Sequence, residues 1–164
     1  MRTQTCIITD AMTAGQVLAS RPVDRLLSIV DPGQAHPIHT GLPDEHELCL
    51  QFDDQFTFRE GTPAPCTEEH IYKIMAFADT FFGGSFCLAH CHAGVSRSTA
   101  AFYIMLAYAS GPSHSESAFK RTLELRPFAR PNRRMIELAQ YEMDRWDLIG
   151  PLDSYEIDLE KVAA

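Results

Sequence analysis

The chain has 164 residues, of which 45% are hydrophobic and 22% are charged, a composition typical of one folded domain and not of a disordered or fibrous chain. Its formal net charge of −8 argues against general nucleic-acid binding and against attraction to an anionic membrane surface. No secretory leader is recognisable at residues 1–20, and the most apolar stretch, Ala100 to Ala109, is about half the length of a bilayer span. We therefore expect a soluble, cytoplasmic protein without stable membrane association.

Four short runs of β-forming residues predict strands, and helical patterns lie between and after them. The strands are expected at Thr5–Thr9, Arg25–Val30, Glu47–Phe52 and Ser85–His90. A helix is expected after Thr67, a suitable N-cap, and Gly83 ends its apolar periodicity. The stretch from Ser98 to Ala109 is apolar on nearly all sides, which indicates a helix buried on every face.

The last third of the chain predicts two more helices and a tail. Ser113 and Glu116 match a capping box for a helix that continues to about Leu125. Pro131 suits the first turn of the next helix. The apolar face of that helix comprises Met135, Ile136, Ala139, Met143 and Trp146. The acidic segment after Pro151 is expected to form a short edge strand or a loose tail.

Strands that alternate with helices predict a single α/β domain with a central, mostly parallel sheet of about four to five strands, flanked by helices on both faces. Ligands of such sheets bind at the carboxyl ends of the strands. The junction that follows the strand predicted at Ser85–His90 is therefore the first candidate site.

The residues at this junction are typical of a phosphate-binding loop. A strand ends at Cys91, five residues form a tight loop, and Arg97 begins a helix. Successive backbone N–H groups and a helix N-terminus attract an anion, Gly94 permits the backbone conformation required, and Arg97 can bind two phosphate oxygens. The same positive field stabilises a thiolate at Cys91, which is then a nucleophile directed at phosphorus.

The whole pattern is specific, because chance gives these residue types at this spacing on the order of once in ten thousand chains of similar composition. His90 to Ser98 resembles the HCxxGxxRS signature of the cysteine-dependent protein tyrosine phosphatases, especially the compact dual-specificity branch and small bacterial tyrosine-phosphatase-like proteins. The similarity covers roughly Thr5 to Trp146. It implies a phosphatase-like catalytic domain at residues 1–147 and a C-terminal tail at 148–164.

The resemblance implies a role for each residue of the motif. Cys91 is the nucleophile that forms a phosphocysteine, and Arg97 binds the phosphate and stabilises the transition state. The Ser98 hydroxyl bonds the cysteine sulfur and helps it leave, and His90 orients the loop and favours the thiolate. The substrate-binding residues are His92, Ala93, Gly94, Val95, Ser96 and Arg97.

The resemblance also requires a general acid from a loop upstream of the cysteine. Asp54 is favoured for this role, and Asp53 is the alternative. Asn132 resembles a residue that braces the phosphate-binding loop. The segment from Lys120 to Arg134 carries six basic residues and one acid, so it either borders the loop or forms a solvated helical face.

Two sets of potential metal ligands are weaker hypotheses. They are Cys87, His90, Cys91 and His92, and a second set of His36, His39 and His46. Residues four apart on a strand lie ~13 Å from each other, and the second set has no paired-ligand spacing, so neither a metal nor another cofactor is expected. Cys49, taken to lie on a strand next to Cys91, is a candidate resolving thiol.

We therefore expect a metal-independent phosphomonoester hydrolase that acts on a phosphorylated protein, most readily at phosphotyrosine. The alternatives are a phosphoinositide or RNA 5′-phosphate phosphatase, a non-catalytic phosphoprotein-binding module and a rhodanese-like sulfur transferase. The loop contains no lysine, which argues against a lipid substrate. The presence of both Cys91 and Arg97 argues against a binding module, and the upstream aspartates argue against sulfur transfer.

Overall fold

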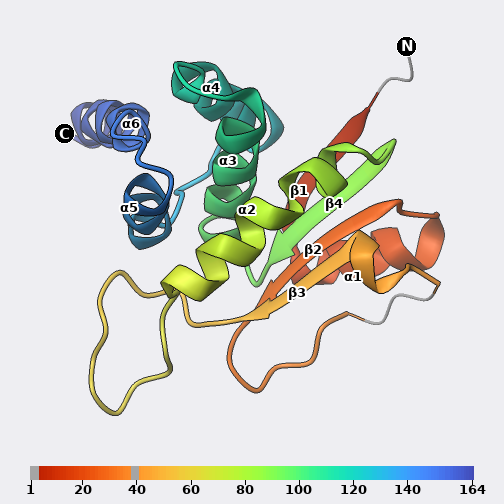
Figure 1. Cartoon of the computed structure of the whole chain (residues 1–164). Coiled ribbons are helices and arrows are strands. Elements are labelled where there is room, and N and C mark those ends of the chain that lie inside the picture. The colour runs from red at the N-terminus through yellow and green to blue at the C-terminus, as the bar shows by residue number, and fades with distance from the viewer. Residues whose placement is uncertain (1–3, 38–40) are drawn as a thin grey trace.

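A parallel sheet with the strand order β1-β4-β2-β3 lies at the centre of the computed structural model, which describes residues 4–37 and 41–164 (Figure 1). The strands are β1 (Thr5–Asp10), β2 (Arg25–Val30), β3 (Glu47–Gln51) and β4 (Phe86–Cys91). The helices are α1 (Ala11–Ser20), the short 3-10 helix η1 (Asp44–His46), α2 (Glu68–Phe82), α3 (Arg97–Ser110), α4 (Ser115–Leu125), α5 (Arg133–Glu142) and α6 (Ile149–Ala163). The predicted α/β class and parallel sheet are confirmed.

Helices cover both faces of this sheet, as predicted, because successive strand residues point to opposite sides. Leu26 and Leu88 face α1 and pack with Ala14 in a small apolar cluster. Leu27 and Ala89, one residue further along their strands, belong to the large core under α2 and α3. β4 is buried along its whole length between β1 and β2, so the residues that follow it emerge at the middle of the sheet.

The helix α1 was not expected from the sequence. Asp10 is its N-cap and accepts a hydrogen bond from the backbone N–H of Thr13 at 2.9 Å. Only Ala14 of this helix is fully buried, so no apolar stripe marks it in the sequence. Its position still matters, because it begins directly beside the loop that follows β4.

Two predicted helix starts were wrong, that of α4 by one residue and that of α5 by two. Ser113 has a positive φ of 69° and lies before the helix, so the expected capping box does not form and α4 begins after His114. Pro131 also lies outside its helix, because Asn132 caps α5 by accepting a hydrogen bond from the backbone N–H of Met135 at 3.1 Å. Trp146, placed on the apolar face of this helix, lies beyond its end and is 60% exposed.

The segment after Pro151 is neither an edge strand nor a loose tail, since it belongs to α6. Leu148 and Leu152 are buried, and the ring of Tyr155 packs edge-on against Phe119 of α4 with centroids 5.6 Å apart. These residues recur at intervals of four and three, which is a helical period. No helix within the described residues is long and apolar enough to span a bilayer.

Candidate active site

Cys91 is the last residue of β4, and its side chain is almost fully buried at the start of the loop His92–Ser96. Its sulfur lies 3.2 Å from the hydroxyl oxygen of Ser98 in the first turn of α3. A hydroxyl at this distance can donate a hydrogen bond to a thiolate. The strand, loop and helix therefore bring the predicted nucleophile and the predicted hydroxyl into contact.

The loop packs tightly against the junction of β1 and α1, and Gly94 makes this possible. Gly94 has a φ of 67°, a conformation that suits glycine. A Cβ atom there would lie 2.3 Å from the carbonyl carbon of Thr9 and 2.5 Å from the backbone nitrogen of Asp10. Any other residue at this position must displace the loop or the junction.

The carbonyl groups of the loop are all bonded to atoms outside it. The backbone N–H of Ala11 donates to the carbonyl oxygen of His92, and the guanidinium of Arg126 donates to those of Ala93 and Gly94. The backbone N–H of Arg130 donates to the carbonyl oxygen of Val95, and that of Asn132 donates to the carbonyl oxygen of Ser96. Because a trans peptide directs its N–H opposite to its carbonyl, the N–H groups of the loop point away from these donors, an arrangement that can bind an anion. The basic segment thus borders the loop, as one of its two interpretations predicted.

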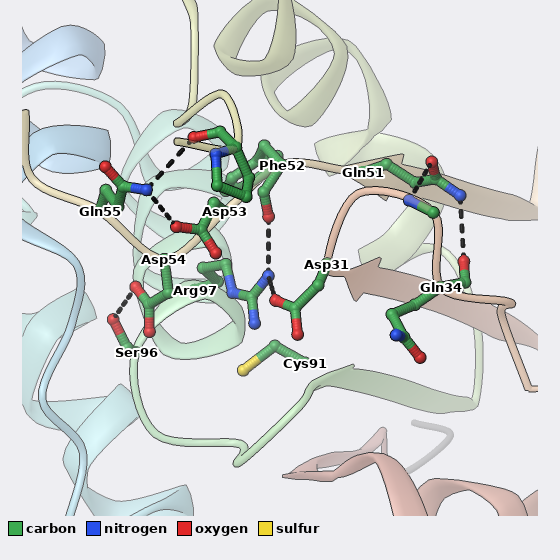
Figure 2. A network of polar contacts seen from close by, with 12 residues as sticks. Asp31, Gln34, Gln51, Phe52, Asp53, Asp54, Gln55, Cys91, Ser96 and Arg97 are labelled. Atoms are coloured by element: carbon green, nitrogen blue, oxygen red, sulfur yellow. Dashed lines mark hydrogen bonds and ion pairs between the residues drawn. The ribbon is translucent and has the colours of Figure 1, made fainter. Parts of the chain in front are cut away.

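Arg97 holds its guanidinium between two fixed acceptors and is only 3% exposed. One terminal nitrogen donates to the carbonyl oxygen of Phe52 and to Oδ1 of Asp31, both at 2.7 Å (Figure 2). The Nε atom is buried and has no hydrogen-bond partner among the described residues. A buried donor without an acceptor is costly, and an oxyanion bound in the loop would supply the acceptor.

Asp31 is a site residue that the sequence analysis missed. It follows β2, which lies next to β4 in the sheet, so the ends of both strands meet at the same edge. The carboxyl-end rule for parallel sheets could have found it only if the strand order had been known.

The structure brings Asp54, and not Asp53, to the loop. Oδ1 of Asp54 accepts a hydrogen bond from the Ser96 hydroxyl at 2.7 Å (Figure 2). It accepts a second, also at 2.7 Å, from the side-chain amide of Asn132. Asp53 faces its own segment, where its carboxylate accepts a hydrogen bond from the Gln55 amide at 2.5 Å. Asn132 therefore lies where it can hold both the loop and the candidate acid.

His90 is fully buried, and burial lowers the pKa of its ring to about 4. The ring is therefore neutral at neutral pH. Its Nδ1 lies 3.3 Å from the carbonyl oxygen of Cys91 and can donate a hydrogen bond to it. His90 can orient the backbone at Cys91, but its neutral ring does not supply a positive charge to a thiolate there.

The structure also bears on the hypotheses that Cys49 is a resolving thiol and that the histidines bind a metal. Cys49 pairs with Ser28 on β2, which itself pairs with His90, so Cys49 lies two strands from β4 and ~10 Å away. The prediction that it occupies a neighbouring strand was wrong. His36 bonds the Ser28 hydroxyl at 2.7 Å, and His39 lies outside the described residues. Within residues 4–37 and 41–164, no group of three metal-ligating side chains comes together.

Comparison with known proteins gives matches among solved structures, whereas no protein-family model and no curated protein matches the chain. Human DUSP28 has a TM-score of 0.63 at 24% identity, with 85% of this chain and 91% of that chain covered. DUSP15 has a TM-score of 0.60 at 17% identity, with 94% of each chain covered. A mouse putative dual specificity phosphatase, complexed with zinc tungstate, has a TM-score of 0.59 at 24% identity over 80% of this chain and 77% of that chain. The chain has the fold of the cysteine-dependent protein tyrosine phosphatases, in the form of their dual-specificity branch.

Proposed function

We propose that the protein is a phosphomonoester hydrolase that forms a phosphocysteine intermediate at Cys91. The observation that carries this proposal is the buried Nε of Arg97, which has no hydrogen-bond partner among the described residues, directly after a loop whose carbonyl groups are all bonded outward. This is a site ready for an oxyanion, with a thiol at its base. The mouse relative was solved with tungstate, a tetrahedral oxyanion, which supports the same chemistry.

The first step transfers the phosphoryl group to sulfur. The Cys91 thiolate attacks phosphorus, while Arg97 and the loop N–H groups stabilise the charge on the equatorial oxygens. Asp54 donates its proton to the leaving oxygen, so the alcohol departs neutral. The hydrogen bonds from Ser96 and Asn132 hold this acid at the edge of the loop.

The second step releases phosphate. Asp54, now a carboxylate, accepts a proton from water as the water attacks the phosphocysteine. The P–S bond breaks, and the Ser98 hydroxyl, 3.2 Å from the sulfur, donates to the departing thiolate. The cycle returns every group to its initial protonation state and consumes one water molecule.

A phosphorylated protein, with phosphotyrosine as the preferred residue, is the substrate class we propose. A surface pocket of about 290 Å³ lies beside Asp54 and is lined by Gln55, Phe56 and Arg59 among others. The side chains of Phe56 and Phe58 are exposed on this segment and could contact residues that flank a phosphorylated side chain.

All five cysteines are free thiols, which supports a cytoplasmic location.

Hydrolysis of an aryl phosphate in the presence of EDTA tests the proposal. We expect turnover by the wild type that vanadate blocks, none by Cys91→Ser, and unchanged turnover by the control Cys49→Ser, whose thiol is exposed and distant. Hydrolysis of phosphotyrosine peptides but not of phosphoinositides or RNA 5′-phosphates would support the substrate class.

Absence of turnover together with binding of a phosphopeptide would contradict catalysis and favour a binding module. One solved structure of similar fold carries a name that fits such a role, the human tyrosine phosphatase-like serine/threonine/tyrosine-interacting protein. It has a TM-score of 0.57 at 21% identity, with 79% of this chain and 82% of that chain covered.

A further inference from the structure

Two cysteines that the proposed chemistry does not use lie side by side at the other end of the sheet. Cys6 of β1 and Cys87 of β4 are direct register partners on adjacent parallel strands. Both side chains belong to the face covered by the large core, so they point the same way. Asp10 and Cys91 are the partners at the opposite, loop end of the same strand pair.

The backbone geometry of this pair is compatible with a disulfide. Neighbouring strands lie about 4.8 Å apart, which falls within the Cα separations of about 4.4–6.8 Å that disulfides span. The two thiols are close enough for each to shift the pKa of the other. Closing the S–S bond requires no exchange of strand partners.

The two thiols differ in accessibility and in acidity, as an attacking thiol and a resolving thiol should. Cys6 is partly exposed, and the adjacent Cys87 thiol, aided by the charge of Arg121, lowers the pKa of Cys6. Cys87 is fully buried, and the adjacent Cys6 thiol together with burial raises its pKa. Its sulfur also lies 2.9 Å from the carbonyl oxygen of Phe81, which fixes its position.

We propose that Cys6 and Cys87 form a redox-active dithiol that a hydroperoxide oxidises to a disulfide joining β1 to β4. The Cys6 thiolate attacks the peroxide oxygen, giving a sulfenic acid, and the O–O bond breaks to release an alcohol or, from hydrogen peroxide, water. The Cys87 sulfur then attacks the sulfenic sulfur, the S–O bond breaks, and water leaves with the Cys87 proton. Two thiols are oxidised and one hydroperoxide is reduced.

This site is separate from the candidate active site. Cys87 and Cys91 lie four residues apart on β4, ~13 Å along the strand, so the dithiol cannot resolve an oxidised Cys91. Burial raises the pKa of the Cys66 thiol to about 12, and burial and Glu47 raise that of Cys49 to about 11. Among the four cysteines outside the phosphate-binding loop, Cys6 is therefore the favoured site of first attack.

The test oxidises the full chain carrying Cys91→Ser with hydrogen peroxide and measures intact mass and free thiols under denaturing conditions. We expect a monomer that is about 2 Da lighter and has two fewer alkylatable thiols. Peptide mapping should find Cys6 linked to Cys87. The Cys91→Ser background removes the most reactive competing thiol and leaves Cys87 as the only cysteine of its tryptic peptide, Ile74–Arg97.

Second substitutions in the same background sharpen the test. Adding Cys6→Ser should abolish the mass loss, whereas adding Cys49→Ser should leave it intact. Four alkylatable thiols after treatment, a sulfinic acid at Cys6 without a cross-link, or a mass loss that persists without Cys6 would each overturn the proposal. The peptide map of the Cys91→Ser chain decides the question even if the double variant does not fold, and none of these readouts depends on phosphatase activity.

Discussion

Substitution of Gly94 by alanine should reduce activity by ~10²-fold or more at a modest cost in stability. The added Cβ would lie 2.3 Å from the carbonyl carbon of Thr9, whereas ordinary contact begins at 3.4 Å, so the loop must move by about 1 Å. Misplacement of reacting groups by about 1 Å can reduce the rate ~10²-fold. The positive φ of 67° adds roughly 1–2 kcal/mol of backbone strain for alanine.

The assay is kcat/KM for an aryl phosphate, measured beside urea unfolding for Gly94→Ala and for a control, Gly111→Ala. Gly111 also has a positive φ, of 78°, but no atom of the described residues outside its own neighbourhood lies within 4 Å of the added Cβ, and Gly111 caps the far end of α3. We expect at least a ~10²-fold loss of kcat/KM for Gly94→Ala and wild-type kcat/KM for the control. Near-wild-type kcat/KM in a folded Gly94→Ala protein would refute the argument that the contact with β1 shapes the loop.

Three further predictions concern the acid, the arginine and the buried histidine. Asp54→Asn should reduce kcat by ~10²-fold or more on aryl phosphates with poor leaving groups and far less on aryl phosphates with activated ones. Asp53→Asn should leave kcat unchanged on both, and the reverse pattern would assign the role of general acid to Asp53. Asp31→Asn removes the charge that fixes Arg97 and should lower kcat/KM about tenfold or more, a loss typical of one charge-assisted hydrogen bond; an unchanged value would mean that Phe52 alone holds the guanidinium. Because burial lowers the pKa of His90 from 6.5 to about 4, the unfolded chain binds a proton that the folded chain does not, and the free energy of unfolding should fall by about 3 kcal/mol as the pH drops from about 7 to about 4. Urea titrations should show this loss in the wild type and most of it removed in His90→Gln, and an equal pH dependence in both would contradict it.

The candidate site could be predicted from the sequence where its residues are contiguous. The proposed nucleophile, the loop and the arginine occupy one strand–loop–helix unit, so their spacing alone places Cys91, Gly94 and Arg97 together. Asp54 needed the resemblance as well, because two adjacent carboxylates do not reveal which one turns toward a loop 40 residues later. The hydrogen bonds from Ser96 and Asn132 make that distinction in the structure.

Other features depend on strand order and tertiary packing, which the sequence does not display. Asp31 reaches Arg97 because β2 lies next to β4 in the sheet. Cys49 is excluded as a resolving thiol for Cys91 because β3 does not lie next to β4. The pair formed by Cys6 and Cys87 likewise exists only through the register of β1 with β4. The helix α1 lacks an apolar stripe because it covers a small cluster, so its N-cap was the single local signal.

The central claim is that Cys91 carries the phosphoryl group between the two steps. Its most direct test is an acid quench of Asp54→Asn during turnover of an aryl phosphate, followed by mass spectrometry of the chain and its peptides. The proposed mechanism predicts a covalent adduct of about 80 Da on Cys91 that forms within the first turnover and is absent from Cys91→Ser. Rapid turnover by the wild type with no adduct in any quenched sample, or turnover that survives in Cys91→Ser, would contradict it.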